Sequence, residues 1–177
     1  MSLAGAIDLL YADESGFCSE GYVPYGWQFK AEQVSVPVDK SLKSRLNCFA
    51  MISRDNRCHW SSTTGTINGE WLMQYLERFS LALTRKTVLV LDCAALHRCK
   101  VIKERMAVWR KRGLWLFYLP PYSPHLNICE TLWRMMKGLW IAPEDYRSVD
   151  TLHYATLSVL RAVGREVRIN YQHFNSN

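Results

Sequence analysis

The sequence predicts an α/β fold, in which one central mixed sheet is flanked by helices. The first third of the chain carries strand-like segments separated by turns, and the later part alternates helices with strands. Its 177 residues fit a single domain. With 49% hydrophobic and 21% charged residues, the chain can form a buried core. These three observations favour one compact mixed sheet over a helical bundle or a disordered chain.

The first elements are strands with antiparallel character. Residues 6–12 form an apolar run, and the residues at 13–16 (Asp-Glu-Ser-Gly) are typical of a turn that ends the strand. Further strands are predicted at 27–37, 46–53 and 58–62, with a hairpin turn at 54–57. This order predicts neighbouring strands that run in opposite directions.

Helices and strands alternate after residue 68. Asn68 can cap a helix over residues 69–83, because its side chain can accept a hydrogen bond from the first turn. The next elements are a strand at 87–91, a helix at 96–112 that ends at Gly113, a strand at 114–119, a helix at 126–139 and a helix at 149–163. Three prolines stiffen the loop at 120–124.

Several protein classes are excluded. Apolar runs stay far below the ~20 residues that span a bilayer, and the N-terminus lacks a basic segment followed by an apolar one. The six cysteines form no CxxC pair, which favours reduced thiols over disulfides or a zinc site. We therefore expect a cytoplasmic protein without a membrane segment.

Positive charge is concentrated in one segment. The chain has a net charge of +6, and residues 97–112 alone carry seven Lys and Arg against one acid, Glu104. On the predicted helix, Lys100, Lys103, Arg110 and Lys111 lie opposite an apolar face formed by Ile102, Met106 and Trp109. Such clustering is typical of a polyanion partner, although a solvated helix face explains it equally well.

Three acids occupy positions suited to metal-dependent phosphodiester chemistry. Asp13 and Asp92 follow predicted strands, where ligands gather in mixed sheets, and Glu130 lies in a helix. Two hard cations held by carboxylates can activate a nucleophile and stabilise the leaving oxygen, and Mg²⁺ prefers such oxygen ligands. The helical spacing places Trp133, Arg134 and Lys137 on the face of Glu130, with Leu132, Met135, Met136 and Leu139 on the buried face.

Each candidate residue also has a simpler interpretation. Asp13 is a good turn residue, Asp92 can cap the next helix, and Glu130 can pair with Arg134. His97 and His125 can be structural, DNA-contacting or ligands. The tryptophans suit a core, with Trp133 or Trp140 as the candidates for base stacking.

Residues 119–137 (LPPYSPHLNICETLWRMMK) resemble a signature of mariner-superfamily transposases, in their bacterial insertion-sequence branch. Residues 90–97 and 11–17 are similar to the second and first aspartate motifs of that family, and the likeness extends to residues 21–27 and 164–171. The resemblance implies a ribonuclease H-like fold, with residues 1–177 as a single DDE catalytic domain. It also implies cleavage and transfer of DNA strands at insertion-sequence ends, in the bacterial cytoplasm near the nucleoid.

The resemblance assigns roles to single residues. Asp13, Asp92 and Glu130 match the three metal-binding acids, with Mg²⁺ as the cofactor and Mn²⁺ as a substitute. Motif residues expected around these acids are His97, Pro121, Tyr122, Asn127 and Trp133. Together with the charge pattern, it predicts DNA contacts for Arg98, Lys100, Lys103, Arg110, Lys111, Arg134 and Lys137. The expected partner is DNA, at transposon ends and target, and the assembly can include a homodimer.

Three departures from the family pattern keep alternatives open. Cys93 stands where the family usually has Asn, and Ile128-Cys129 replaces a more common Pro-Ile. The first strand begins near Met1, so we expect the family's N-terminal helix-turn-helix region to be absent here and supplied by a longer chain or a separate reading frame. A decayed DNA-binding remnant and another ribonuclease H-like nuclease, such as a junction resolvase, are the competing interpretations.

Overall fold

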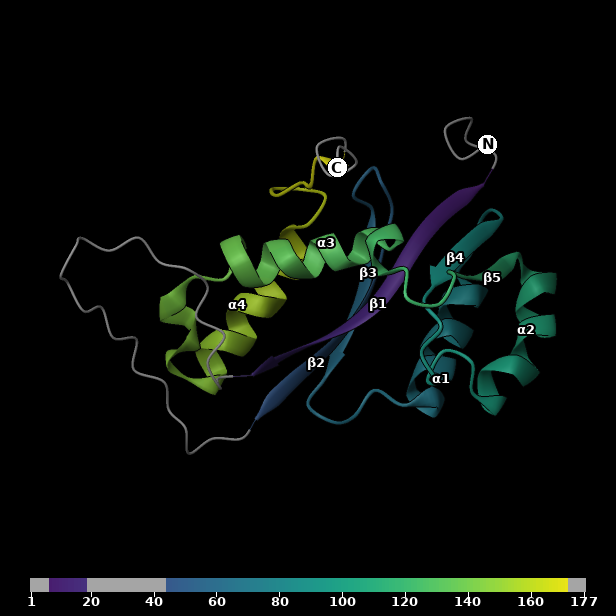
Figure 1. The fold of residues 1–177 in the computed structure, drawn as a ribbon, viewed down its shortest axis with the longest axis horizontal. Helices are drawn as coiled ribbons and strands as arrows, with labels where there is room; N and C mark the ends of the chain where they lie inside the picture. Colours follow the sequence, from purple (N-terminus) through teal and green to yellow (C-terminus); the bar gives the residue numbers. More distant parts are fainter. Residues whose placement is uncertain (1–6, 19–43, 172–177) are drawn as a thin grey trace.

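The computed structural model describes residues 7–18 and 44–171 and contains one five-stranded sheet in the order β3-β2-β1-β4-β5 (Figure 1). Strands β1, β2 and β3 pair antiparallel, whereas β1, β4 and β5 pair parallel. The strands are β1 (Asp8–Cys18), β2 (Arg45–Ile52), β3 (Cys58–Thr63), β4 (Thr87–Leu91) and β5 (Leu114–Tyr118). The helices are α1 (Gly69–Leu81), α2 (Lys100–Arg112), α3 (Ile128–Met135) and α4 (Val149–Ala162). The predicted mixed sheet flanked by helices is confirmed.

The first strand is longer than the sequence predicts. The interpretation of residues 13–16 as a turn is wrong, because β1 continues to Cys18. Along this stretch β1 pairs with β2, from Tyr11 opposite Ile52 to Cys18 opposite Arg45. This sheet pairing outweighs the local turn preference of Asp, Ser and Gly. The strand predicted at 27–37 lies outside the described residues.

The helix boundaries follow their capping residues. The Asn68 side chain accepts a hydrogen bond from the Trp71 amide (2.9 Å), as predicted. Gly113 ends α2 with φ of 95°, a conformation that glycine adopts without steric cost. The α2 helix begins at Lys100, later than predicted, because residues 95–98 form turns. None of the helices within residues 7–18 and 44–171 is long and apolar enough to cross a membrane.

The helix after the proline loop changes its geometry at its C-terminal end. The α3 helix continues into a π-helical turn over Met136–Trp140. In a π turn each hydrogen bond spans one residue more than in an α-helix, so the apolar face is displaced. Leu139, predicted to be buried, is therefore 72% exposed, and Ile141 is buried instead. Trp133, predicted on the exposed face, is only 4% exposed and packs edge-on against Phe17, with ring centroids 6.1 Å apart.

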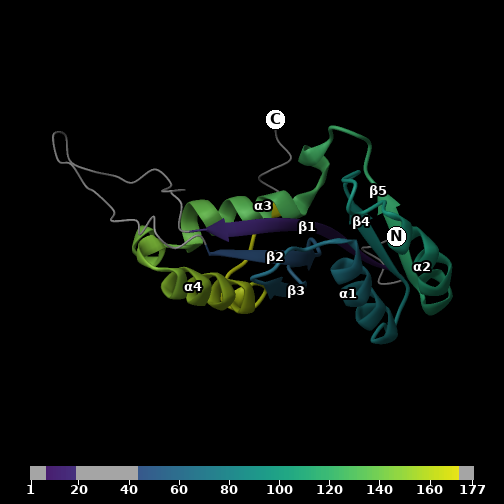
Figure 2. The ribbon, with the colours of Figure 1, turned by 90° about the horizontal axis from the view of Figure 1, so that it is seen from below.

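Two apolar clusters form the core, and alternate side chains of the sheet contribute to one cluster or the other. Along β2, Cys48, Ala50 and Ile52 pack with α3 and α4. The alternate residues Phe49 and Met51 pack with α1 and α2. Figure 2 shows α3 and α4 around one end of β1 and β2, and α1 and α2 beside β4 and β5. The sheet alternation therefore explains why adjacent residues of one strand serve different halves of the molecule.

The C-terminal segment is attached to the β2–β3 turn through Asn56. The buried Asn56 side chain donates to the Ile169 carbonyl (3.1 Å) and accepts from the Ile169 amide (2.7 Å). Gly164 lies against this turn with φ of 81°, and a Cβ there would collide with the Asn56 carbonyl. Asn56 itself has a positive φ of 67°, which Asn tolerates better than most residues.

We predict that Asn56→Ala lowers the free energy of unfolding by about 2–4 kcal/mol, because it leaves two buried backbone groups of Ile169 without partners. Asn56→Gly removes the same hydrogen bonds without conformational strain and should cost nearly as much. Urea unfolding measures both changes. The exposed neighbour Arg54 provides the control, with Arg54→Ala changing stability by less than about 0.5 kcal/mol. A wild-type stability for Asn56→Gly would contradict the prediction.

Candidate functional site

Asp13 and Asp92 come from two adjacent parallel strands, Asp13 within β1 and Asp92 directly after β4. The pairing of β1 with β4 runs from Asp8 opposite Thr87 to Tyr11 opposite Val90. Asp13 and Asp92 each lie two residues beyond the last pair, Asp13 within β1 and Asp92 just after the end of β4. Because side chains alternate along strands, Asp13 belongs to the side of the sheet that carries Tyr11. The predicted adjacency of the two acid-bearing strands is confirmed.

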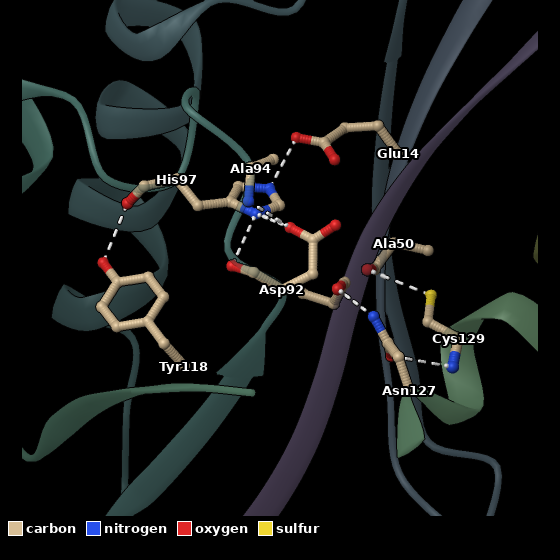
Figure 3. A network of polar contacts seen from close by, with 9 residues as sticks. Glu14, Ala50, Asp92, Ala94, His97, Tyr118, Asn127 and Cys129 are labelled. Carbon is tan, nitrogen blue, oxygen red and sulfur yellow. Dashed lines mark hydrogen bonds and ion pairs between the residues drawn. The ribbon is translucent and has the colours of Figure 1, made fainter. Parts of the chain in front are cut away.

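Asn127 positions the helix that carries Glu130. Its side chain accepts a hydrogen bond from the Cys129 amide (3.1 Å) and so caps α3. The same side chain donates to the Ala12 carbonyl (3.0 Å), one residue before Asp13 (Figure 3). Asn127 is buried, and Cys129 adds a contact from Sγ to the Ala50 carbonyl (3.5 Å). The start of α3 is therefore attached directly to the strand that bears Asp13.

Glu130 lines three clefts, and two of them each contain one of the aspartates. The first cleft, of about 520 Å³, is lined by Asp13 and Glu130 together with Arg134 and Lys137. The second, of about 390 Å³, is lined by Asp92 and Glu130 together with Arg98, Pro121 and Tyr122. Tyr122 is fully exposed and has φ of 57°. Glu130 therefore lies between the two aspartates.

The ionised form of the Asp13 carboxyl is electrostatically unfavourable. Burial raises the pKa of its carboxyl to about 7, and the negative charges of Glu130, Glu14 and Asp92 contribute further. Such charge effects act at a distance and need no contact between the carboxylates. A divalent cation would offset both causes, because it supplies the missing positive charge.

The acids do not form a preassembled metal cluster. Within residues 7–18 and 44–171, no three His, Cys, Asp or Glu side chains lie close enough together to hold a metal ion. We expect the three carboxylates to converge around cations, and without a cation the repulsion between their charges favours Glu130 turned away. The donor set still fits Mg²⁺ or Mn²⁺, because it consists of hard carboxylate oxygens on adjacent strands and a neighbouring helix.

A buried histidine joins Asp92 to Glu14. The His97 Nδ1 atom lies 2.6 Å from Asp92 Oδ1, and its Nε2 atom lies 2.8 Å from Glu14 Oε1 (Figure 3). Burial alone would lower the pKa of His97, but hydrogen bonds and charges from Glu14 and Asp92 outweigh it and raise the pKa to about 9. Sequence reasoning missed Glu14, because residues 13–16 were interpreted as a turn; a strand interpretation would have placed Asp13 and Glu14 on opposite faces.

Cys93 connects the ends of β4 and β5. Its Sγ atom donates a hydrogen bond to the Leu119 carbonyl (3.1 Å). This contact holds the start of the proline loop beside Asp92. The thiol that stands in place of the family's usual Asn therefore still forms a polar contact next to the acid site.

Most of the predicted DNA-contacting cations are exposed. The exposed ones are Arg98, Lys100, Lys103, Arg110, Lys111 and Arg134. Lys137 is partly buried, with Nζ 5.3 Å from the centroid of the Phe17 ring. Lys100 lies 3.8 Å from Glu104, and the Arg110 guanidinium stacks over Trp115. These side chains leave positive charge at the surface of α2 and beside the first cleft.

Two other cations of α2 form ion pairs with α1 instead. Arg105 and Arg112 each form an ion pair of 2.6 Å with Glu77 of α1. Trp109 donates a further hydrogen bond to the same carboxylate (2.9 Å). Hydrogen bonds from Arg105 and Arg112 lower the pKa of Glu77 to about 2. The net surface charge of this segment is therefore smaller than its composition suggests.

The fold resembles solved DNA-processing assemblies. The Mos1 mariner paired end complex with Mn has a TM-score of 0.66 at 13% identity, over 87% of this chain and 48% of that chain. The Mos1 strand transfer complex has a TM-score of 0.62 at 14% identity, over 87% and 47%. A simian T-cell lymphotropic virus intasome, solved with the PP2A regulatory subunit B56 gamma, has a TM-score of 0.61 at 9% identity, over 96% and 55%.

These similarities and the sheet order define the class as the ribonuclease H-like fold of DDE transposases and integrases. Residues 8–153 match the family model described as DDE superfamily endonuclease, and the chain belongs to that family. It spans about half the length of the solved chains that it matches. No curated protein matches the sequence.

We predict that Asp13→Asn stabilises the metal-free protein at pH 8 by an amount on the order of 1–3 kcal/mol. Because folding raises the pKa of Asp13 from 3.8 to about 7, its favourable contribution is complete below pH 3.8 and is lost as the pH rises through 7. Urea unfolding with a chelator at pH 4 and pH 8 measures the difference.

The exposed Asp150 provides the matched control, with Asp150→Asn giving no gain at either pH. The prediction fails if wild type and Asp13→Asn have equal stability at pH 8, since the aspartate would then carry no electrostatic penalty.

Proposed function

We propose that this chain is the catalytic domain of a DNA transposase, which cleaves and joins DNA strands at insertion-sequence ends. The observation that carries the proposal is the placement of Asp13 within β1 and Asp92 directly after the adjacent parallel strand β4, with Glu130 on the helix attached to β1. Membership of the DDE superfamily endonuclease family and a fold shared with mariner and intasome complexes support it.

The three acids would hold Mg²⁺, for which Mn²⁺ can substitute. Bound there, the cations would activate the attacking oxygen and stabilise the leaving oxygen. Two solved Mos1 complexes are described as containing Mn and Mg, which supports the same requirement here. In this chain, Asp13 would give up its proton to become a ligand, while Asn127 keeps Glu130 beside it.

DNA binding would come from cations in the clefts beside the acids and from exposed cations of α2. Arg134 and Lys137 share a cleft with Asp13, and Arg98 shares a cleft with Asp92, so these three would contact phosphates near the scissile bond. The cations of α2 would contact the DNA backbone further away. Phosphate contacts give affinity without sequence readout. We therefore assign end recognition to a helix-turn-helix region in a longer chain or a separate reading frame.

The remaining parts of the proposal follow from this role. Residues 1–177 would act as one DDE catalytic domain of a bacterial insertion sequence, working on the nucleoid and able to pair as a homodimer. Cys93 favours one competing function, a DNA-binding remnant without activity, because it replaces the usual Asn beside Asp92. Cleavage assays separate the two.

We predict that Asp92→Asn lowers Mn²⁺-dependent cleavage of supercoiled plasmid by at least about 100-fold, because it removes a metal ligand. DNA affinity should stay equal or rise, since a negative charge near phosphate is lost. Gel analysis of plasmid nicking and filter binding measure the two quantities. Asp150→Asn serves as the control with wild-type cleavage. Cleavage by Asp92→Asn at the wild-type rate would refute the site. A wild-type chain that cleaves no DNA with either Mg²⁺ or Mn²⁺ would favour the inactive DNA-binding remnant.

We also predict non-specific DNA binding with a dissociation constant of ~10⁻⁴–10⁻⁶ M at physiological salt. Replacing Lys103, Arg110 and Lys111 together by Ala should weaken binding and reduce the salt slope by up to about 3. Filter binding across several salt concentrations measures the slope. The matched control replaces Arg147, Arg161 and Arg165, which are exposed and outside α2, and should leave the slope nearly unchanged. Equal salt slopes of DNA binding for the two triple variants would contradict the assignment of DNA contacts to α2.

A further inference from the structure

We propose that Glu14 and His97 are positioning residues that hold the Asp92 carboxylate in one orientation, with Oδ2 turned toward the cation. The inference rests on the proposed function, in which Asp92 is a metal ligand. It assigns a role to Glu14, and it makes Glu14 a support rather than an additional ligand.

The hydrogen bonds to the Asp92 carboxylate involve only one of its two oxygens, Oδ1, among the described residues. His97 Nδ1 and the Ala94 amide both bond to Oδ1, at 2.6 Å and 2.9 Å. The structure records no hydrogen bond to Oδ2 from the described residues. The Asp92 side chain is 47% exposed, so without these bonds it could adopt several rotamers. The two contacts therefore select one orientation and leave one oxygen for a ligand.

His97 itself is fixed from several directions. Its side chain has no exposed surface, so both ring nitrogens depend on protein partners. The Tyr118 hydroxyl donates to the His97 carbonyl (2.8 Å), and the His97 amide donates to the Ala94 carbonyl (3.1 Å), as Figure 3 shows in part. The backbone of the residue whose imidazole holds Asp92 is thus attached to β5 and to the turn after β4.

Glu14, in β1, is the third member of the hydrogen-bonded series Asp92–His97–Glu14. It follows Asp13 in β1, and side-chain alternation directs the two residues to opposite sides of the sheet. From its side, Glu14 Oε1 reaches His97 Nε2 at 2.8 Å. One strand therefore supplies a candidate ligand through Asp13 and the support of the other ligand through Glu14.

A chain of carboxylate, imidazole and carboxylate is poorly explained by stability alone. Burying charged groups carries a large desolvation cost, and apolar residues of similar volume often stabilise a core as well or better. Groups that orient metal ligands typically change metal affinity by 10–100-fold when they are removed. The buried position of His97 between Glu14 and Asp92 matches this second use.

The test measures Mn²⁺ affinity of the full chain for Glu14→Gln and His97→Gln, by electron paramagnetic resonance of free Mn²⁺. The dissociation constant should rise about 10–100-fold in both variants. Cleavage should require correspondingly more Mn²⁺ and recover at saturating Mn²⁺, while DNA affinity stays at the wild-type value. Rescue by metal separates positioning from a merely structural role, which added Mn²⁺ would not repair.

Matched controls make the outcome decisive. Glu144→Gln changes an exposed glutamate and should leave Mn²⁺ affinity unchanged. If His97→Gln unfolds, Glu14→Gln alone decides, because it retains the shape of the side chain. The inference is overturned if Glu14→Gln binds Mn²⁺ within twofold of wild type while Asp92→Asn loses it. If Asp92→Asn also binds like wild type, the proposed function fails together with the inference.

Discussion

The register between β1 and β4 is the constraint on which the site depends. The parallel pairing ends with Tyr11 opposite Val90, and Asp13 in β1 and Asp92 after β4 each follow that last pair by two residues. A shift of one residue would turn one of the two aspartates to the other side of the sheet. The same alternation gives Glu14 its separate place beside His97, so one register sets both the acids and their support.

Two polar attachments then hold carboxylates that would otherwise repel one another. Asn127 connects the start of α3 to Ala12, and His97 connects Asp92 to Glu14. Each attachment joins β1 to a segment distant in sequence. Burial raises the pKa of Asp13 most, and the negative charges of Glu130, Glu14 and Asp92 raise it further. Such stored repulsion is typical of sites that bind cations, because the cation removes it.

Much of the architecture could be predicted from local patterns, since Asn68, Gly113 and the apolar run of β4 act within a few residues. The continuation of β1 over residues 13–18 could not be predicted, because it depends on pairing with β2. No local pattern in the sequence reveals the register of that pairing. Leu139 and Trp133 were misplaced because an α-helical period cannot anticipate a π turn or the packing against Phe17. The acids were found from their spacing and family resemblance, whereas Glu14 required the three-dimensional contact to His97.

The central claim is that Asp13, Asp92 and Glu130 together form a divalent cation site. A crystal structure of the full chain with Mn²⁺, analysed by anomalous scattering, tests it most directly. The account predicts an anomalous peak bound by Asp13 and by Oδ2 of Asp92, with Glu130 turned toward it and the His97 contact to Oδ1 retained. A structure at saturating Mn²⁺ with no peak between the two aspartates, or with peaks only elsewhere, would contradict the account.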